Sequence, residues 1–144
     1  MNKEEELAYW AGFLDGEGWI GIGRSFVKDH PRVRVCYRLV AGLVNTNEDI
    51  MERFTTRFGG YLYLRKATEN HKPTWDTHTT GETAYNILKI LLPYFIVKRK
   101  QAEVAIEYYE KTHPAPRGRR LTKDELELRE IYYQKMKILN KRGV

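Results

Sequence analysis

The glycine-rich segment LDGEGWIGIG, residues 14–23, restricts the fold of this chain more than any other feature. Gly16, Gly18 and Gly21 have the G-x-G-x-x-G spacing of nucleotide-binding loops, which need a strand before them and a helix after them. Here the order is reversed. Residues 2–14 have acidic residues first and then apolar residues at helical spacing, whereas residues 19–27 alternate as a strand does. The segment therefore ends a helix and begins a strand, which argues against nucleotide binding.

The rest of the chain predicts further strands and helices in a regular order. A helix begins at Thr46 or Asn47, as N-cap, and Thr122 with Glu125 forms a capping box before the last helix. The predicted strands are 20–26, 32–44, 60–67 and 74–80, and two more helices follow Gly81 and the segment 95–101. The order is α-β-β-α-β-β-α plus two helices, an α+β fold in a single domain, residues 1–144.

Residues 32–44 alternate with period two. Arg32, Arg34 and Arg38 share one face, and the residues from Val33 to Leu43 at odd positions share the other. We expect a half-buried antiparallel strand with a basic outer face. Residues 74–80 have Trp75 as the one clearly apolar side chain, so their facing stays open.

Charge and composition limit the partners. The net charge is +6 and the pI about 9.4, which favours an anionic partner. Residues 97–144 carry the whole excess, and residues 24–44 form a second basic zone. The single cysteine, Cys36, excludes an internal disulfide. No apolar run approaches the roughly 20 residues that span a bilayer, and the start MNKEEEL lacks the apolar region of a secretory signal. We expect a soluble, intracellular protein that does not bind membranes.

Residues 10–18, WAGFLDGEG, resemble the motif of the LAGLIDADG homing endonucleases. The predicted element order matches that family's core, so the resemblance covers about residues 4 to 112 and leaves a helical extension at about 113–144. It implies a curved antiparallel sheet and a site-specific double-strand DNA endonuclease that cleaves a long, near-palindromic target, with a role in intron homing. An RNA-binding intron maturase, which would bind its own intron RNA, and a DNA-binding regulator that has lost cleavage are the alternatives.

The chain has one motif, and single-motif members of the family act as homodimers in which two motif helices pack together. Small residues permit that close approach, and Gly16 and Gly18 would also let the chain turn sharply from helix to strand. The resemblance implies an interface that contains Trp10, Ala11, Gly12, Asp15 and Gly16.

Resemblance also assigns the catalytic groups. Glu17 matches the metal-binding acid and Gly16 would add its backbone carbonyl, with Mg²⁺ as the cofactor and Mn²⁺ as a substitute. Asn45 would orient the attacking water, and the alternative is an ordinary loop or capping asparagine. Lys98 would stabilise charge at the scissile phosphate, and the alternative is a solvated basic turn.

The outer face of the strands is the expected DNA-reading surface, because an antiparallel ribbon fits the major groove and arginine can bond guanine with two hydrogen bonds. Its members are Arg24, Arg32, Arg34, Arg38, Tyr61, Tyr63 and Arg65. The RGRR run at 117–120 suits phosphate contact at most, and the four histidines are expected to be loop or surface residues.

Overall fold

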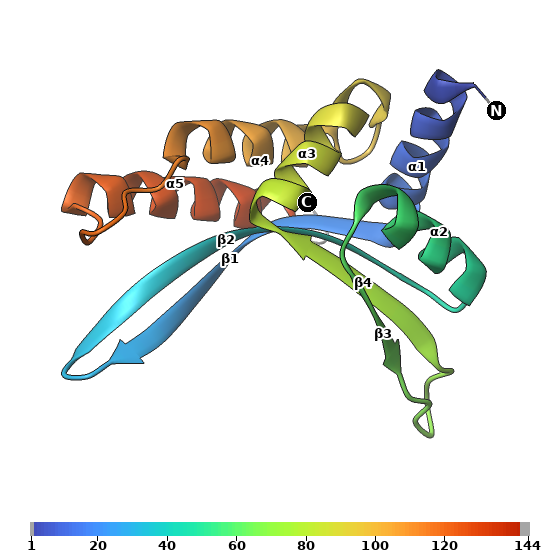
Figure 1. Cartoon of the computed structure of the whole chain (residues 1–144), viewed down its shortest axis with the longest axis horizontal. Coiled ribbons are helices and arrows are strands. Elements are labelled where there is room, and N and C mark those ends of the chain that lie inside the picture. Colours follow the sequence, from blue (N-terminus) through green and yellow to red (C-terminus); the bar gives the residue numbers. More distant parts are fainter. Residues whose placement is uncertain (1, 142–144) are drawn as a thin grey trace.

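The computed structural model describes residues 2–141 and has the α+β architecture predicted from the sequence (Figure 1). Its elements, in chain order, are α1 (Lys3–Glu17), β1 (Gly18–Asp29), β2 (Arg32–Asn45), α2 (Glu48–Phe58), β3 (Tyr61–Arg65), β4 (Thr74–Thr80), α3 (Gly81–Leu91), a 3₁₀ turn η1 (Leu92–Tyr94), α4 (Arg99–Thr112) and α5 (Lys123–Leu139). The predicted order and the N-caps at Asn47 and Thr122 are confirmed. Among the described residues, no helix is long and apolar enough to cross a membrane.

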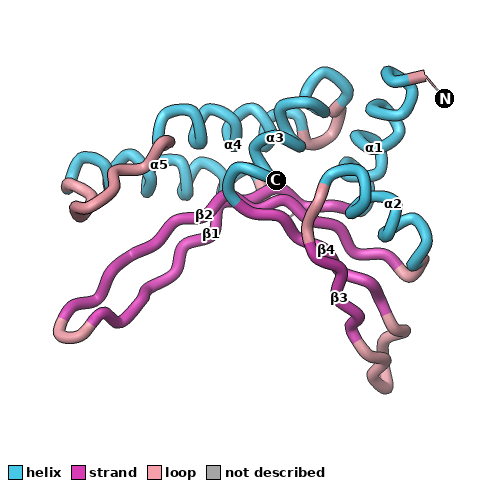
Figure 2. Tube along the Cα trace, viewed as in Figure 1, coloured by secondary structure: helices cyan, strands magenta, loops and turns pink. Residues whose placement is uncertain are grey.

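The four strands form one antiparallel sheet in the order β1-β2-β4-β3. Figure 2 shows the helices gathered on one side of this sheet, while the β1–β2 and β3–β4 hairpins diverge on the other side like the two legs of an arch. The underside of the arch carries no helix. We call this side of the strands the open face and the opposite side the helix face.

Helix α1 packs against the rest of the protomer through one buried side. A capping box between Asn2 and Glu5 starts the helix, and Leu7, Trp10, Ala11 and Leu14 are buried. The Trp10 ring meets the rings of Phe54 and Phe58 of α2 edge-on, at centroid distances of 5.6 and 6.1 Å. These aromatic contacts fix α2 against α1.

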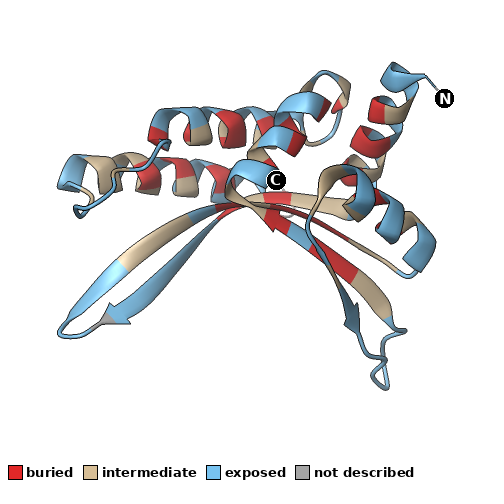
Figure 3. Cartoon of the chain, in the orientation of Figure 1, coloured by how far each residue is buried: buried red, intermediate tan, exposed pale blue. Residues whose placement is uncertain are grey.

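The prediction for residues 32–44 holds for only part of the strand. Leu39, Ala41 and Leu43 are buried under the helices, but Val33 is 64% exposed. Both hairpin strands are longer than predicted and turn at residues 30–31, and the hairpin end diverges from the helix layer (Figure 3). With no layer above it, the apolar side of the strand stays in contact with solvent.

The structure also gives the facing of β4. Trp75, Thr77 and Thr79 lie on the helix face, where the Thr79 hydroxyl donates to the carbonyl of Ala41 at 3.0 Å. Asp76 and His78 lie on the open face, because successive strand residues point to opposite sides.

Candidate active site and nucleic-acid interface

Asp15, near the C-terminal end of α1, holds the start of α4. Its carboxylate accepts hydrogen bonds from the backbone N–H groups of Ile96, Val97 and Lys98, at 2.8, 3.3 and 2.9 Å. An acid is unfavourable at the C-terminus of its own helix but favourable at the N-terminus of another. Because the carboxylate acts within the chain, Asp15 is a structural residue of the protomer.

The same contact brings Lys98 to the end of α1. Its Nζ donates to the carbonyl oxygen of Asp15, two residues before Glu17. Glu17 is the last residue of α1 and is exposed, with no ion pair to any described side chain. An unpaired acid at a helix C-terminus is unfavourable without a compensating cation, so this carboxylate is open to an external one.

Asn45 ends β2. β1 begins with Gly18 opposite Leu43, so Asn45 lies two residues, roughly 7 Å, beyond the start of β1. Its side-chain oxygen accepts the N–H of Asn47 at 2.8 Å. This contact is a local turn before the N-cap Asn47, as an ordinary loop asparagine forms. The amide nitrogen of Asn45 has no hydrogen-bond partner among the described residues.

The glycines at the α1–β1 joint do not act as predicted. Gly18 has φ −104° and ψ −178°, so no special backbone freedom is needed there. A Cβ on Gly18 would lie 2.7 Å from Leu14 Cδ2 and 2.8 Å from the carbonyl oxygen of Gly42. Gly16 lies inside α1. The chain does pass directly from α1 into β1, but the backbone freedom of glycine is not the reason, and the need at Gly18 is for space.

The expected interface residues separate into two sides of α1. Trp10 and Ala11 are 6% and 0% exposed within the protomer, so they belong to its core, and their placement in an interface is wrong. Gly12 and Gly16 are exposed, and a Cβ on either would meet nothing within 4 Å.

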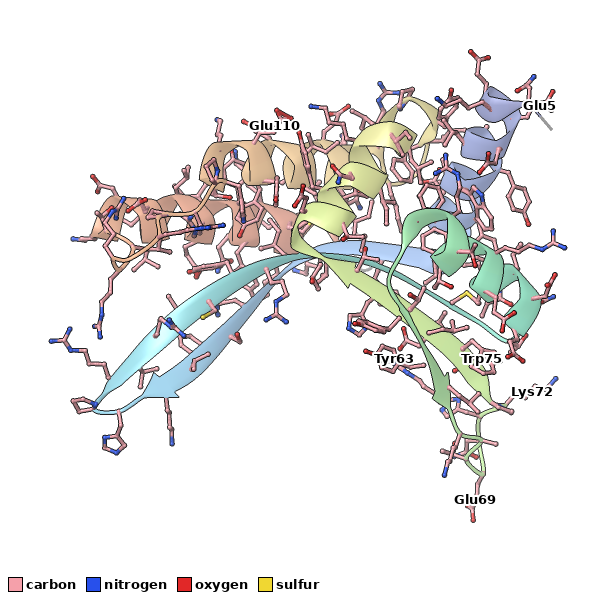
Figure 4. All side chains as sticks on the ribbon, viewed as in Figure 1. Glu5, Tyr63, Glu69, Lys72, Trp75 and Glu110 are labelled. Atoms are coloured by element: carbon pink, nitrogen blue, oxygen red, sulfur yellow. The ribbon has the colours of Figure 1, made fainter. Side chains whose placement is uncertain are left out.

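Most of the expected reading residues lie on the open face. The register places Arg32, Arg34 and Arg38 there on β2, all exposed. Tyr61 and Tyr63 are 76% and 48% exposed on β3, and Figure 4 shows the Tyr63 side chain under the arch.

Arg65 is on the open face but is not free. It pairs with Oδ2 of Asp76 at 2.5 Å. Asp76 is 5% exposed, and its Oδ1 has no hydrogen-bond partner among the described residues. The ion pair with the buried Asp76 carboxylate keeps the Arg65 side chain close to the sheet.

Arg24 lies on the opposite side of the sheet from the other expected reading residues. On β1 it has the same parity as Ile20 and Ile22, which are buried on the helix face, and it pairs there with Glu130 of α5. Its predicted place among the reading residues is wrong.

His78 is a residue that sequence reasoning missed. It lies exposed on the open face, and its ring stacks on Tyr63 at 5.5 Å with an interplanar angle of 12°. The facing of His78 could not be predicted from alternation, because the helix face of β4 carries Thr77 and Thr79 in place of apolar residues.

Metal binding by this chain alone is not supported by a preformed cluster. Within residues 2–141, no group of three or more His, Cys, Asp or Glu side chains is placed to hold an ion. The donors present at the end of α1 are the Glu17 carboxylate and the last carbonyls of the helix, which have no intrahelical partner. These are hard oxygen ligands of the type that Mg²⁺ takes together with phosphate and water.

Comparisons with known proteins agree with this architecture. A family model described as LAGLIDADG endonuclease matches residues 10–111. No curated protein sequence matches significantly.

Solved structures share the fold at low sequence identity. The homing endonuclease I-CvuI, in complex with a DNA target, superposes with a TM-score of 0.74 at 20% identity, over 98% of this chain and 86% of that one. The archaeal intron-encoded homing endonuclease I-Vdi141I, complexed with DNA, gives 0.75 at 18% identity, over 99% and 89%. I-LtrWI, bound to target DNA, gives 0.70 at 21%, over 94% of this chain but 44% of that longer one.

Proposed function

This chain belongs to the LAGLIDADG endonuclease family, and from that premise we propose that it is a homodimeric, metal-dependent enzyme that cleaves double-stranded DNA at a specific, near-palindromic site. One observation carries the proposal. Glu17 has an exposed carboxylate, and Lys98 is anchored to the Asp15 carbonyl two residues before it. Glu17 leads directly into β1 of a sheet whose open face bears exposed arginines and tyrosines. Cutting and reading groups thus lie on adjoining segments of the chain.

In this proposal Glu17 and the carbonyl of Gly16 hold a divalent cation. Bound there, the cation would neutralise charge that develops on the phosphate during hydrolysis. Mg²⁺ is the proposed ion and Mn²⁺ its substitute, since both take oxygen ligands.

Lys98 and Asn45 have supporting roles. The Lys98 ammonium is held by the Asp15 carbonyl and would face the non-bridging phosphate oxygens and the leaving 3′ oxygen. The free amide nitrogen of Asn45 would orient the attacking water, which an amide can do without taking its proton.

The second protomer is proposed to pack on the exposed side of α1. Ala8, Gly12 and Gly16 follow one another along this side at intervals of four residues, and all are exposed. Ile96 and Val97, whose backbone N–H groups bind Asp15 near the C-terminal end of α1, are 86% and 72% exposed. An apolar surface beside small residues suits a close helix pair, and a twofold axis there would bring two Glu17 carboxylates together. One copy of this fold spans 44% of the I-LtrWI chain, which is consistent with a need for two copies.

The open face of the sheet is proposed to lie in the DNA major groove. Arg32, Arg34 and Arg38 would contact base edges and phosphates, and Tyr61 and Tyr63 would add contacts from β3. Arg65 joins them through the face that its pair with Asp76 leaves exposed.

Glu17→Gln tests the chemistry, because it keeps the shape of the side chain and removes the charge. With Mg²⁺ present, we expect single-turnover cleavage to fall at least about a hundredfold, while DNA binding persists. Chelation of the metal should stop wild-type cleavage, and Mn²⁺ should restore it.

Glu4→Gln is the matched control, since Glu4 is exposed in the first turn of the same helix. It should cleave like the wild type. Near wild-type cleavage by Glu17→Gln would remove Glu17 from the active site.

A further inference from the structure

The β1–β2 hairpin is anchored along only part of its length. On its helix face, the cross-strand pair Ile22–Leu39 is buried, at 6% and 1% exposure. The next pair toward the tip is Arg24–Tyr37, and beyond it Phe26 is 67% exposed. The Arg24–Tyr37 pair therefore marks the point where the hairpin leaves the core.

Glu130 of α5 binds both members of this pair. Arg24 Nη1 donates to both carboxylate oxygens of Glu130, and the Tyr37 hydroxyl donates to Oε2 at 3.1 Å. The Arg24 and Glu130 side chains are 28% and 34% exposed, so their attraction is less screened by water than that of a fully exposed pair.

Tyr133, one turn further along α5, completes the contact. The Arg24 guanidinium lies 4.4 Å from the centre of the Tyr133 ring, within the range of a cation–π interaction. The Tyr37 and Tyr133 rings meet edge-on at 6.3 Å. Burial, and then the hydrogen bond to Glu130, raise the pKa of Tyr37 above its ordinary value, so the phenol stays a donor at neutral pH. We call Arg24, Tyr37, Glu130 and Tyr133 the brace.

Small changes in angle at the brace become large at the tip. β1 continues for five residues beyond Arg24, about 17 Å, so a tilt of about 10° moves the tip by about 3 Å. That is close to the rise of about 3.4 Å from one base pair to the next. Hydrogen bonds tolerate only a few tenths of an ångström, so the angle decides which bases the tip side chains meet.

We propose that Glu130 is a positioning residue for target recognition, which holds the hairpin at the angle where Arg32 and Arg34 face the base pairs farthest from the cut. β1 leaves the Glu17 end of α1 and runs twelve residues to its tip, so the tip serves the outer part of each half-site. The inference rests on the proposed function. Glu130 and Tyr133 of α5 lie outside the residues 10–111 matched by the family model, whereas Arg24 and Tyr37 lie inside them, so the brace ties the matched core to the C-terminal extension.

Target-site selection with the full-length protein tests the proposal. Glu130→Ala should lose about tenfold in discrimination at one or two outer positions of each half-site and change by less than about twofold at positions next to the cut. Glu130→Gln keeps one acceptor oxygen and should recover part of the discrimination. Glu127→Ala is the matched control, because Glu127 is exposed on the same helix and forms no ion pair with a described side chain. An unchanged profile for Glu130→Ala, or an equal loss at all positions, would overturn the proposal.

A second readout needs no DNA. Cys36 is the single cysteine of the chain and is half-buried on the open face of the hairpin, next to Tyr37. A nitroxide on Cys36 should become more mobile in Glu130→Ala and stay as in the wild type in Glu127→Ala, with urea unfolding to confirm that both variants are folded. Equal mobility in all three proteins refutes the brace. Higher mobility supports it even if the wild type selects no DNA sequence, in which case the proposed function fails instead.

Discussion

Replacing Asp15 with alanine tests how the end of α1 holds the start of α4. The change removes the acceptor of three backbone N–H groups, those of Ile96, Val97 and Lys98, and leaves the helix itself unbroken. Each hydrogen bond to a charged group contributes about 1.5–3 kcal/mol. Ile96 and Val97 are exposed and share one carboxylate oxygen, so water would replace part of what is lost. We expect the free energy of unfolding to fall by about 2–4 kcal/mol for Asp15→Ala and by about 1–2 kcal/mol for Asp15→Asn, which keeps one oxygen.

Urea unfolding at a fixed protein concentration measures these differences, since a dimer's stability depends on concentration. Asp49→Ala is the control, because Asp49 pairs with Arg53 in an exposed i,i+4 contact, at 71% and 69% side-chain exposure, and should cost at most about 0.5 kcal/mol. Single-turnover cleavage should also fall in Asp15→Ala, as Lys98 loses its backbone anchor. A value for Asp15→Ala within about 0.5 kcal/mol of wild type would refute the reasoning.

Three further predictions concern the interface, the reading surface and the C-terminal extension. Gly12→Leu should leave the protomer folded, because a Cβ there meets nothing within 4 Å, yet sediment as a monomer while the wild type sediments near twice its 17.0 kDa chain mass; a dimeric variant would place the interface elsewhere. Arg38→Ala should weaken the free energy of binding to the preferred DNA by about 1–3 kcal/mol and relax the preference at one position per half-site. The double change Arg119→Ala and Arg120→Ala should weaken binding equally on all sequences. Target-site selection separates the two outcomes, and a shift of preference with the double change alone would contradict the open face as the reading surface. The pKa of Glu125 is lowered from 4.5 to about 2, first by its hydrogen bond with Arg119 and then by its capping contacts with Thr122. Its stabilising contribution is therefore present above about pH 4.5 and lost as the pH falls toward 2, so thermal melts of wild type and Glu125→Gln should converge over that interval, and a constant difference would contradict the assignment.

The sequence predicted those parts of the fold that depend on short-range chemistry. The cap at Asn47 and the box of Thr122 and Glu125 were predicted because they involve residues two or three positions apart. Val33 was misjudged because its exposure depends on how far the helices reach over β2, which no local pattern contains.

Arg24 shows a different kind of failure. It was grouped with the β2 arginines by composition, although its parity with Ile20 and Ile22 on β1 already indicated the helix face. On β4 no such reference exists, so the open-face positions of Asp76 and His78 could only come from the register.

The motif helix was predicted as one functional unit, but packing divides it. The protomer's core buries Trp10, Ala11 and Leu14, whereas Gly12 and Gly16 are exposed on the surface of the helix. Small and apolar residues suit both a core and an interface, so residue type alone cannot separate the two sides.

The two acids of the motif are separated in the same way by what surrounds them. Asp15 turns inward and binds the N-terminal end of α4, which fixes Lys98 at the end of α1. Glu17 emerges one position before Gly18, where the chain is packed so tightly that no Cβ fits. The tight packing at Gly18 therefore fixes the position of Glu17 relative to the first residues of β1. In the same way, the hydrogen bonds with Asp15 fix the position of Lys98. In a dimer, the distance between the proposed cut and the bases read along β1 would then follow from packing at these two points, and the brace at Glu130 would set only the outer end of the same strand.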